Sequence, residues 1–404
     1  MKAEVRMKND EWKTAALGDL VEPAKTWNPT RSPSDEVFDY IDLSAVDQDA
    51  KLITGAREVS CGEAPSRARQ LVARGDVLVS TVRPNLNGVA RVPDQLDGAT
   101  ASTGFCVLRA RESKFDGGYL FQWVKSPAFV ADMVNKATGA SYPAVSDRII
   151  FDSRIPLPPV AEQRRIAEVL DRAEALRAKR RAALAQLDSL TQSLFLDLFG
   201  DPATNPKGWP MKQLGEVATE VYRYPTYYDI NYEDDGVPEI RGELLNSDGS
   251  MVTDRTRLRF ISAKTSARFP KTVLAIGDLV MSVRGTIGKI GLVPPELAGG
   301  QITANLIRIA LDQTLLDPLF AWNVTQTSFF KQQITNACSS TTILTIKAPD
   351  LKRLPVPVPP IELQREFARR VTAVEALKTA QRASLAELDA LFASLQHRAF
   401  RGEL

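Results

Sequence analysis

Apolar residues recur in alternating steps of three and four across the segment 157–199. The positions that carry this pattern are Ile166, Leu170, Ala173, Leu184, Leu187, Leu194 and Leu198. No Gly or Pro interrupts the chain between Pro159 and Gly200, and the segment is rich in Ala, Leu, Glu, Arg and Gln, a composition that favours a long α-helix. A narrow apolar seam of this kind is typical of a two-stranded coiled coil. The pattern therefore predicts one long helix that needs a helical partner.

A second copy of this pattern occupies the segment 358–400. Its seam consists of Phe367, Val371, Val374, Leu385, Leu388, Phe392, Leu395 and Ala399. Polar residues break both seams at the same central place, with Arg177 and Arg180 in the first copy and Lys378 and Gln381 in the second. The simplest partner for each helix is therefore the other helix, and each would be about 55 Å long. The alternative is two unrelated surface helices on one globular domain.

The repeat also covers the residues that precede each helix. Paired segments with similar sequence are 17–20 with 214–217, 75–83 with 277–284, 105–109 with 305–309, and 120–123 with 319–322. Alternating and continuous apolar runs predict strands in these segments, and the spacing over 119–134 predicts a helix. We therefore expect an α/β (α+β) domain followed by a long helix, twice. The predicted boundaries are 1–155 for the first domain, 156–200 for the first helix, 201–357 for the second domain and 358–404 for the second helix.

The two copies differ between these matched segments. The second copy contains the segments 222–228 and 255–259, rich in Tyr and Arg, which have no counterpart in the first copy. One scaffold with two different surfaces predicts two related but unequal ligands.

Composition places few limits on the ligand. The chain of 404 residues is 44% hydrophobic and 25% charged, which is typical of a folded protein of two or three domains. A net charge of +2, from 51 Lys and Arg against 49 Asp and Glu, leaves room for a strongly basic face. No apolar run is long enough to span a bilayer and no apolar signal core follows the N-terminal residues, so we expect a cytoplasmic protein. Cys61, Cys106 and Cys338 are too scattered to predict a disulfide framework or a zinc site.

Candidate catalytic residues are scarce. His397 is the only histidine, and its place near the end of the second helix suggests a solvated or capping residue. The segment 285–290 resembles a phosphate-binding loop, but its spacing is too short and no Ser or Thr follows Lys289. The segment 317–320 lacks the second proline of an amino-methyltransferase motif. A non-catalytic role is favoured, and an enzyme with unrecognised catalytic residues stays an alternative.

The duplicated Pro-Pro-x-x-x-Gln-Arg motif, at 155–166 and again at 356–365, closely resembles the specificity subunit of type I restriction–modification enzymes. The last residues, 395–404, also look like the end of that subunit. The second motif departs from the usual Glu-Gln pair by having Leu363 before Gln364. The likeness spans the whole chain.

This resemblance implies a DNA-binding subunit in a phage-defence system, without catalysis or a cofactor of its own. Each α/β domain would be a target recognition domain for one half of an asymmetric bipartite site in double-stranded DNA. The helices would pair as an antiparallel coiled coil with pseudo-two-fold symmetry, which sets the spacer between the half-sites. In the family the coiled coil docks two modification subunits that methylate adenine with S-adenosylmethionine, and restriction subunits supply ATP- and magnesium-dependent translocation and cleavage.

Candidate DNA-binding residues follow from the chemistry of DNA. Arg, Asn and Gln are best suited to base edges, and Arg, Lys, Ser and Thr to phosphates. The candidates in the first domain are Arg67, Arg69, Arg83, Asn85, Asn87, Ser141 and Tyr142. Those in the second domain are Tyr224, Arg255, Arg257, Arg284, Thr286, Thr341, Thr342 and Lys347. Each could instead be an ordinary solvated side chain or turn former.

Two alternatives keep this architecture but change the function. The chain could be a coiled-coil adaptor whose domains bind protein rather than DNA. It could also be the specificity subunit of a different methyltransferase-based phage-defence system.

Overall fold

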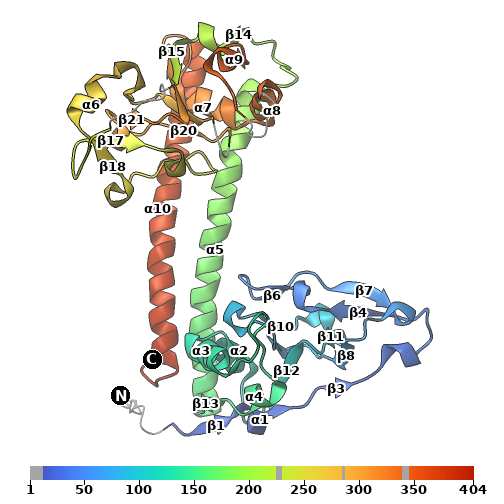
Figure 1. Cartoon of the computed structure of the whole chain (residues 1–404). Helices are drawn as coiled ribbons and strands as arrows, with labels where there is room; N and C mark the ends of the chain where they lie inside the picture. The colour runs from blue at the N-terminus through green and yellow to red at the C-terminus, as the bar shows by residue number, and fades with distance from the viewer. Residues whose placement is uncertain (1–11, 224–229, 284–286, 339–344) are drawn as a thin grey trace, which may run out of the picture. The chain divides into compact units, whose positions relative to one another are not determined.

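The computed structural model of the chain describes residues 12–223, 230–283, 287–338 and 345–404. The chain forms two compact units, of which unit 1 combines the residues up to Ala182 with Ala383–Leu404, and unit 2 is Ala183–Arg382. The two long helices, α5 (Val160–Phe199) and α10 (Ile361–Ala399), each contribute to both units (Figure 1). A compact unit is therefore one α/β domain with parts of both helices. The predicted boundaries between domains and helices stay a prediction.

Unit 1 is built, within its described residues, on a four-stranded and a five-stranded sheet. The four-stranded antiparallel sheet has the order β10 (Val89–Arg91), β9 (Val77–Ser80), β12 (Phe105–Ala110) and β2 (Val21–Glu22). The five-stranded sheet has the order β3 (Lys25–Thr26), β8 (Ala68–Leu71), β11 (Thr100–Ser102), β4 (Val37–Ile41) and β7 (Arg57–Ser60). Unit 1 also contains two separate two-stranded sheets, β1 (Thr14–Ala16) with β13 (Arg154–Pro156) and β5 (Val46–Asp47) with β6 (Leu52–Ile53).

The shorter helices of unit 1 are α1 (Leu17–Leu20), α2 (Gly117–Val124), α3 (Pro127–Lys136) and α4 (Asp147–Phe151). The helical structure predicted over 119–134 is confirmed, but the structure divides it between α2 and α3. Ser126 caps α3 by accepting a hydrogen bond from the backbone N–H of Phe129 at 3.2 Å, and Pro127 follows as the first helical residue. Proline is suited to the first turn of a helix and not to a helix interior, so a new helix begins there.

Unit 2 repeats the plan of unit 1. Its first sheet has the order β15 (Ala218–Arg223), β22 (Leu306–Leu311), β19 (Leu279–Ser282) and β20 (Ile290–Leu292). Its second sheet has the order β16 (Tyr232–Glu233), β18 (Arg259–Ile261), β17 (Val237–Ile240) and β21 (Gln301–Ile302), and β14 (Met211–Gln213) pairs with β23 (Pro355–Pro357). The shorter helices are α6 (Ala263–Ala267), α7 (Pro318–Gln326), α8 (Ser328–Ala337) and α9 (Ala348–Lys352).

The first sheets of the two units have the same strand order, and the second sheets share the order β11-β4-β7 and β21-β17-β18 with matching register. The parallel pair β11 and β4 places Thr100 opposite Tyr40, and the parallel pair β21 and β17 places Gln301 opposite Glu239. The predicted fold class, two similar α/β domains that each precede a long helix, is confirmed.

Both long helices supply side chains to the core of each unit. In unit 1, Ile166 and Leu170 of α5 and Phe392 and Ala399 of α10 are buried in one cluster with the sheet residues. The equivalent cluster of unit 2 buries Phe195, Phe199, Phe367 and Val371. The predicted antiparallel pairing of the helices is confirmed. Near the end of α5 the buried positions are the phenylalanines, while the predicted Leu194 and Leu198 are only partly buried, because an aromatic cluster fills this place.

The duplicated motif explains how each domain is held on its helix. Gln364 is fully buried; its side-chain oxygen accepts a hydrogen bond from the backbone N–H of Asp317 at 2.8 Å, and its amide donates to the carbonyls of Pro359 at 2.7 Å and Leu315 at 3.1 Å. Gln163 is also fully buried and makes the equivalent bonds to Asp116 N–H at 2.9 Å and the carbonyls of Pro158 at 2.8 Å and Lys114 at 3.4 Å. The glutamine therefore joins the start of the helix to the segment that precedes α2 or α7.

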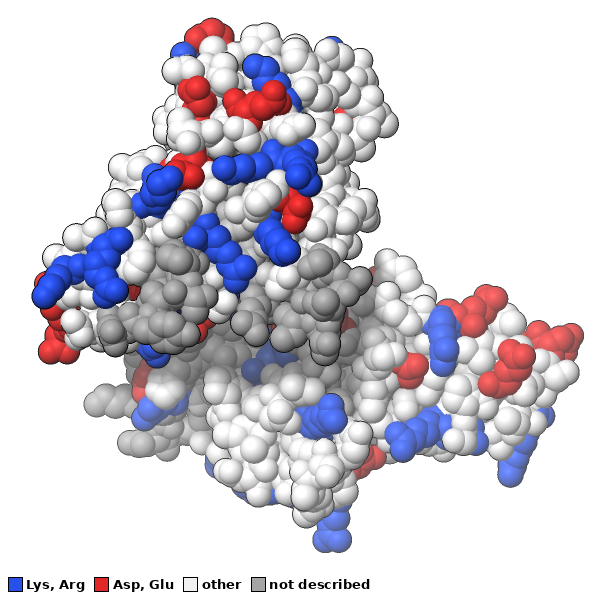
Figure 2. Space-filling model, turned by 45° about the horizontal axis from the view of Figure 1, so that its top comes forward, with Lys and Arg blue, Asp and Glu red and all other residues white. Residues whose placement is uncertain are grey.

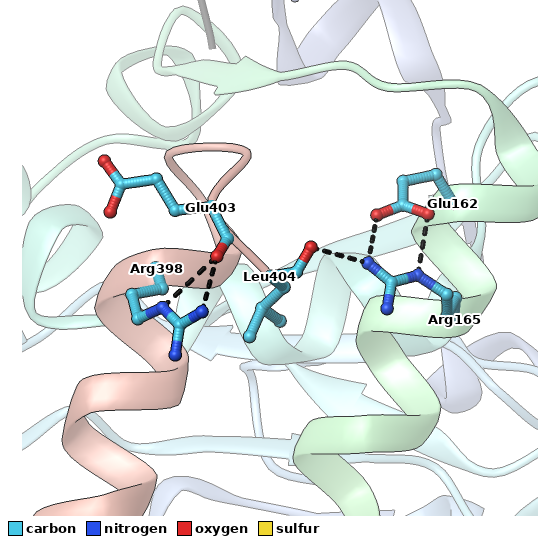
Figure 3. Close-up of polar contacts among 5 residues, drawn as sticks. All are labelled: Glu162, Arg165, Arg398, Glu403 and Leu404. Atoms are coloured by element: carbon cyan, nitrogen blue, oxygen red, sulfur yellow. Dashed lines mark hydrogen bonds and ion pairs between the residues drawn. The ribbon is translucent and has the colours of Figure 1, made fainter. Parts of the chain in front are cut away.

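The residues after α10 pack onto the first turns of α5 in unit 1. Arg165 donates to both carboxylate oxygens of Glu162, at 2.8 and 2.7 Å, and to the carbonyl of Leu404 at 3.0 Å (Figure 3). Arg398 donates twice to the carbonyl of Glu403, at 3.2 and 2.7 Å. The chain beyond α10 is thus fixed by two arginines.

Candidate DNA-binding surface

A strained loop of unit 1 presents the candidate Arg83. This residue follows β9 and has a φ of +50°, in the left-handed region that non-glycine residues seldom adopt. Its backbone N–H donates to the carbonyl of Pro143 at 2.7 Å, and its guanidinium carbon lies 4.8 Å from the centroid of the Tyr142 ring. Tyr142 is 68% exposed. The structure therefore brings together two residues that the sequence named separately, on an exposed surface, in a backbone conformation of the kind that clusters at functional sites.

Asn87 has an internal role at the other end of this loop. Its φ is +46°, and its side-chain amide donates to the carbonyl of Lys125 at 3.4 Å. Lys51 donates to the carbonyl of Asn87 at 2.6 Å, and Lys125 forms an ion pair with Glu174 on α5. Burial lowers the pKa of Lys125, and Glu174 opposes that shift. Asn87 thus anchors the loop toward α5, while Asn85 and Ser141 are exposed beside Arg83 and Tyr142.

The other two candidates of unit 1 lie before and at the start of β8. Arg67 is exposed, and Arg69 is half-buried and donates to the carbonyl of its neighbour Ala68 at 2.7 Å. No contact described for unit 1 joins either of them to the Arg83 loop.

In unit 2 the candidates Arg255 and Arg257 form a single 3-10 turn, Arg255–Arg257, capped by Asp254. Arg255 pairs with Asp235 and lies 4.7 Å from the centroid of the Phe260 ring. Lys347 is exposed at the start of α9. The remaining candidates, which are Tyr224, Arg284, Thr286, Thr341 and Thr342, lie outside the described residues.

A basic segment surrounds these two arginines. Over 255–271 all charged residues are cations, and all are exposed: Arg255, Arg257, Arg259, Lys264, Arg268 and Lys271. Figure 2 shows Lys and Arg side chains gathered on the drawn face of unit 2, with fewer carboxylates between them. The last four are not among the DNA-binding candidates predicted from the sequence, although the absence of any Asp or Glu over this stretch is a signal that the sequence carries. Such a surface attracts phosphate groups.

Beside this segment lies a polar cleft of about 590 Å³. Its lining includes Tyr232, Glu239, Arg241, Arg259, Lys289 and Asn305. Glu239 is only 4% exposed; burial raises the pKa of its carboxyl, while the Tyr232 hydroxyl, which donates to it at 3.3 Å, opposes the shift. Among the described residues no cluster of His, Cys, Asp and Glu has the arrangement of a metal site, and no described helix could cross a membrane.

Comparison with known families identifies what the two domains are. The model of the type I restriction modification DNA specificity domain matches the chain twice, over residues 9–186 and 206–389. The chain belongs to this family. The DNA specificity domain is therefore present in two copies, which agrees with the duplication seen in the fold.

Individual relatives extend this result. The chain is 25% identical over 332 residues to the type I restriction enzyme EcoBI specificity subunit of Escherichia coli, covering 74% of this chain and 68% of that one. It is 21% identical over 401 residues to a putative type I restriction enzyme MjaX specificity subunit of Methanocaldococcus jannaschii, covering 93% and 89%. A solved chain from a study of complex assembly in the type I restriction–modification system matches at 29% identity with a TM-score of 0.62, covering 97% and 98%. An S subunit from M. genitalium, 13% identical, shares the fold with a TM-score of 0.57 over 99% and 98%.

Proposed function

We propose that this specificity subunit recognises an asymmetric bipartite sequence in double-stranded DNA, with one half-site for each domain. The observation that carries the proposal is the duplicated specificity domain whose two copies match in register but differ at exposed and cleft-lining positions. Matched scaffolds place DNA in the same way in both domains, and different side chains there select different bases. The basic segment 255–271 and the Arg83 loop supply the cations for phosphate contacts.

The partners complete the proposal. The subunit acts without catalysis of its own, and two modification subunits that carry S-adenosylmethionine methylate adenine in the recognised site. Restriction subunits add ATP- and magnesium-dependent translocation and cleavage. The paired helices set the length of the unread spacer and dock the modification subunits.

Deletion of the gene tests the recognition proposal. We expect one bipartite methyladenine motif to disappear from the methylome of the cell, because no other subunit selects that sequence, and to return on complementation. All other methylated motifs should stay unchanged, and they serve as the internal control. An unchanged methylome in a strain with an intact system would contradict the proposal, and loss of a single continuous motif would contradict the two-half-site arrangement.

One side of the helix pair is suited to partner docking. In unit 1, Leu176 of α5 is 54% exposed and Leu391 of α10 is 51% exposed, and each directly precedes a residue of the seam. Because the helices are antiparallel, positions just before the seam lie on the same side of the pair. Unit 2 repeats this feature with Leu190 and Leu377. The opposite side has charged residues at the equivalent places, namely Glu174, Arg181, Asp188, Glu375, Arg382 and Asp389.

We expect the double substitution Leu176→Glu and Leu391→Glu to weaken binding of the modification subunit at unit 1 more than tenfold. Two carboxylates would have to be buried without partners in an interface that otherwise gains from apolar contact. Isothermal titration calorimetry with the purified modification subunit should show two equivalent binding sites for the wild-type subunit and only one tight site for this variant. Arg181→Ala, on the opposite side, is the control and should bind both copies normally. Two intact sites in the leucine variant would contradict this docking side.

A further inference from the structure

The cleft of unit 2 contains charged groups that are not equally free to meet a ligand. Arg241 lies between two carboxylates, with its Nε 3.8 Å from Glu239 and its Nη1 2.7 Å from Glu243. It also donates to the carbonyl of Arg257 at 3.2 Å, so the turn that holds the basic segment is tied to the cleft. Arg241 is therefore neutralised and fixed in place. Arg259 and Asn305 are exposed, while Lys289 is half-buried and donates from its Nζ to the carbonyl of Leu245 at 3.2 Å.

Strand register identifies the residues of unit 1 that occupy the same places. Tyr40 lies where unit 2 has Glu239, because each faces the equivalent residue of the parallel neighbour strand. Arg57 pairs across the sheet with Tyr40 as Arg259 pairs with Glu239, so these two arginines are equivalent. The cation is therefore common to both units, whereas the residue beneath it is not.

The rim of the cleft differs in the same way. Ser80 N–H donates to the carbonyl of Gly88 at 2.8 Å, and Ser282 N–H donates to that of Lys289 at 3.0 Å. Thr81 N–H donates to the carbonyl of Gly104 at 2.9 Å, and Val283 N–H donates to that of Asn305 at 3.0 Å. Lys289 and Asn305 thus replace two glycines of unit 1. A Cβ at Gly104 would lie 2.9 Å from a methyl carbon of Leu43, so a side chain there would require Leu43 to shift.

The chemistry of the cleft favours a base over a phosphate. At the floor of the cleft Arg241 is already paired with Glu239, which is 4% exposed, and with Glu243, so its charge is not available to a phosphate. At the rim, the Asn305 amide can donate to and accept from the major-groove edge of adenine, and the Lys289 ammonium can donate to that of guanine. Contacts that position DNA are expected to be common to both domains, and contacts that select bases are expected to differ.

We propose that Lys289 and Asn305 read purine edges in the half-site bound by unit 2, and that the equivalent arginines Arg57 and Arg259 contact DNA phosphates in both half-sites. This assignment rests on the proposed function, because it requires that each domain bind one half-site. Glu239, with Arg241, is a positioning residue that holds the floor and the neighbouring turn in place. The Gly88 and Gly104 positions of unit 1 leave the first half-site without this reader.

Methylome sequencing of cells that express the subunit with its modification subunit tests the assignment. We expect Lys289→Ala and Asn305→Ala each to make one position of one half-site degenerate, with discrimination at that position falling about ten- to a hundredfold. The other half-site and the spacer should be unchanged. Arg259→Ala and Arg57→Ala should leave the motif intact, weaken binding evenly across sequences, and reduce the slope of log affinity against log salt by about 1.

The matched controls are the variants Lys331→Ala and Asn336→Ala, at two exposed positions of α8. Cells that express either control with the modification subunit should show the wild-type methylation motif. Every variant is first compared with wild type by thermal melting and by binding of the modification subunit, so that a folding defect is recognised. A wild-type motif in the folded Lys289→Ala, Asn305→Ala double variant would overturn the assignment while leaving the proposed function intact. Absence of any bipartite motif with the wild-type subunit would instead overturn the proposed function itself.

Discussion

Lys378→Glu is expected to lower the free energy of unfolding of unit 2 by about 3 kcal/mol, because it places a negative charge where a buried cation joins the two helices. The Lys378 side chain is 7% exposed, and its Nζ lies 3.0 Å from Asp188 on α5 and 2.7 Å from Glu375 on its own helix. Burial works to lower the pKa of Lys378, but the two carboxylates outweigh it and the pKa is raised. The substitution would bring three carboxylates together.

The size of this effect comes from the unpaired charge and not from the ion pair alone. Asp188 and Glu375 are 64% and 49% exposed, so solvent screens their attraction for the lysine. Lys378→Met, which keeps the shape of the side chain, should therefore change the unfolding free energy by only about 1 kcal/mol. Chemical denaturation of the three proteins, followed by hydrogen exchange to assign each transition to a unit, measures the difference.

The repeat supplies a matched control for this prediction. Arg177 of α5 pairs with Asp389 of α10 at 2.5 Å in unit 1, in the place that Lys378 and Asp188 take in unit 2. Asp188→Lys should restore most of the stability that Lys378→Glu removes, whereas Asp389→Lys should not. A Lys378→Glu protein as stable as wild type would show that the ion pair between Lys378 and Asp188 does not fix the helices to one another.

Gln364→Leu is also expected to cost about 3 kcal/mol of unfolding free energy in unit 2, by a different route. The leucine fills the same space but leaves one backbone N–H and two backbone carbonyls buried without partners, and each such group is destabilising by about 1 kcal/mol or more. Hydrogen exchange should therefore rise around Leu315–Asp317 and at the start of α10. Hydrogen exchange measured at increasing temperature gives the loss of local unfolding free energy in this region.

Two further variants make the prediction for Gln364→Leu specific. Gln163→Leu should produce the same loss in unit 1, around Lys114 and Asp116. Gln186→Leu, at an exposed position of α5, should leave exchange in both units at the wild-type rate. Equal exchange in all three variants would mean that the buried glutamine contributes nothing beyond the volume of its side chain.

The long helices and the duplication could be predicted from the sequence because their signals are periodic. The seam positions Phe367, Val371 and Phe392 are buried as their spacing requires, and Arg177 and Lys378, which interrupt it, are paired with carboxylates of the facing helix. Composition and period both report on local geometry, and a helix is local geometry repeated many times.

The binding surface could be predicted only in part, because it depends on contacts between distant segments. Arg83 was named, but neither its left-handed backbone nor its contact with Tyr142 has a sequence signal. The cleft was missed altogether. Its walls come from separate strands and turns, and Glu239 is a single carboxylate in an otherwise ordinary strand until the register places it between Arg241 and Arg259.

Unit 1 is built from two separate stretches of the chain, and this has a consequence for folding during translation. Its core contains Phe392 and Ala399, and Phe400 packs against Trp123 with ring centroids 5.0 Å apart, yet the ribosome synthesises all of unit 2 before it reaches these residues. At cellular elongation rates, roughly 10–40 s pass between synthesis of the first domain and synthesis of the end of α10, which completes the core of unit 1. Unit 2 has no such delay, since its residues are contiguous. During this interval the first domain exposes the apolar surface around Ile166 and Leu170 that α10 later covers, and a chaperone can bind to that surface.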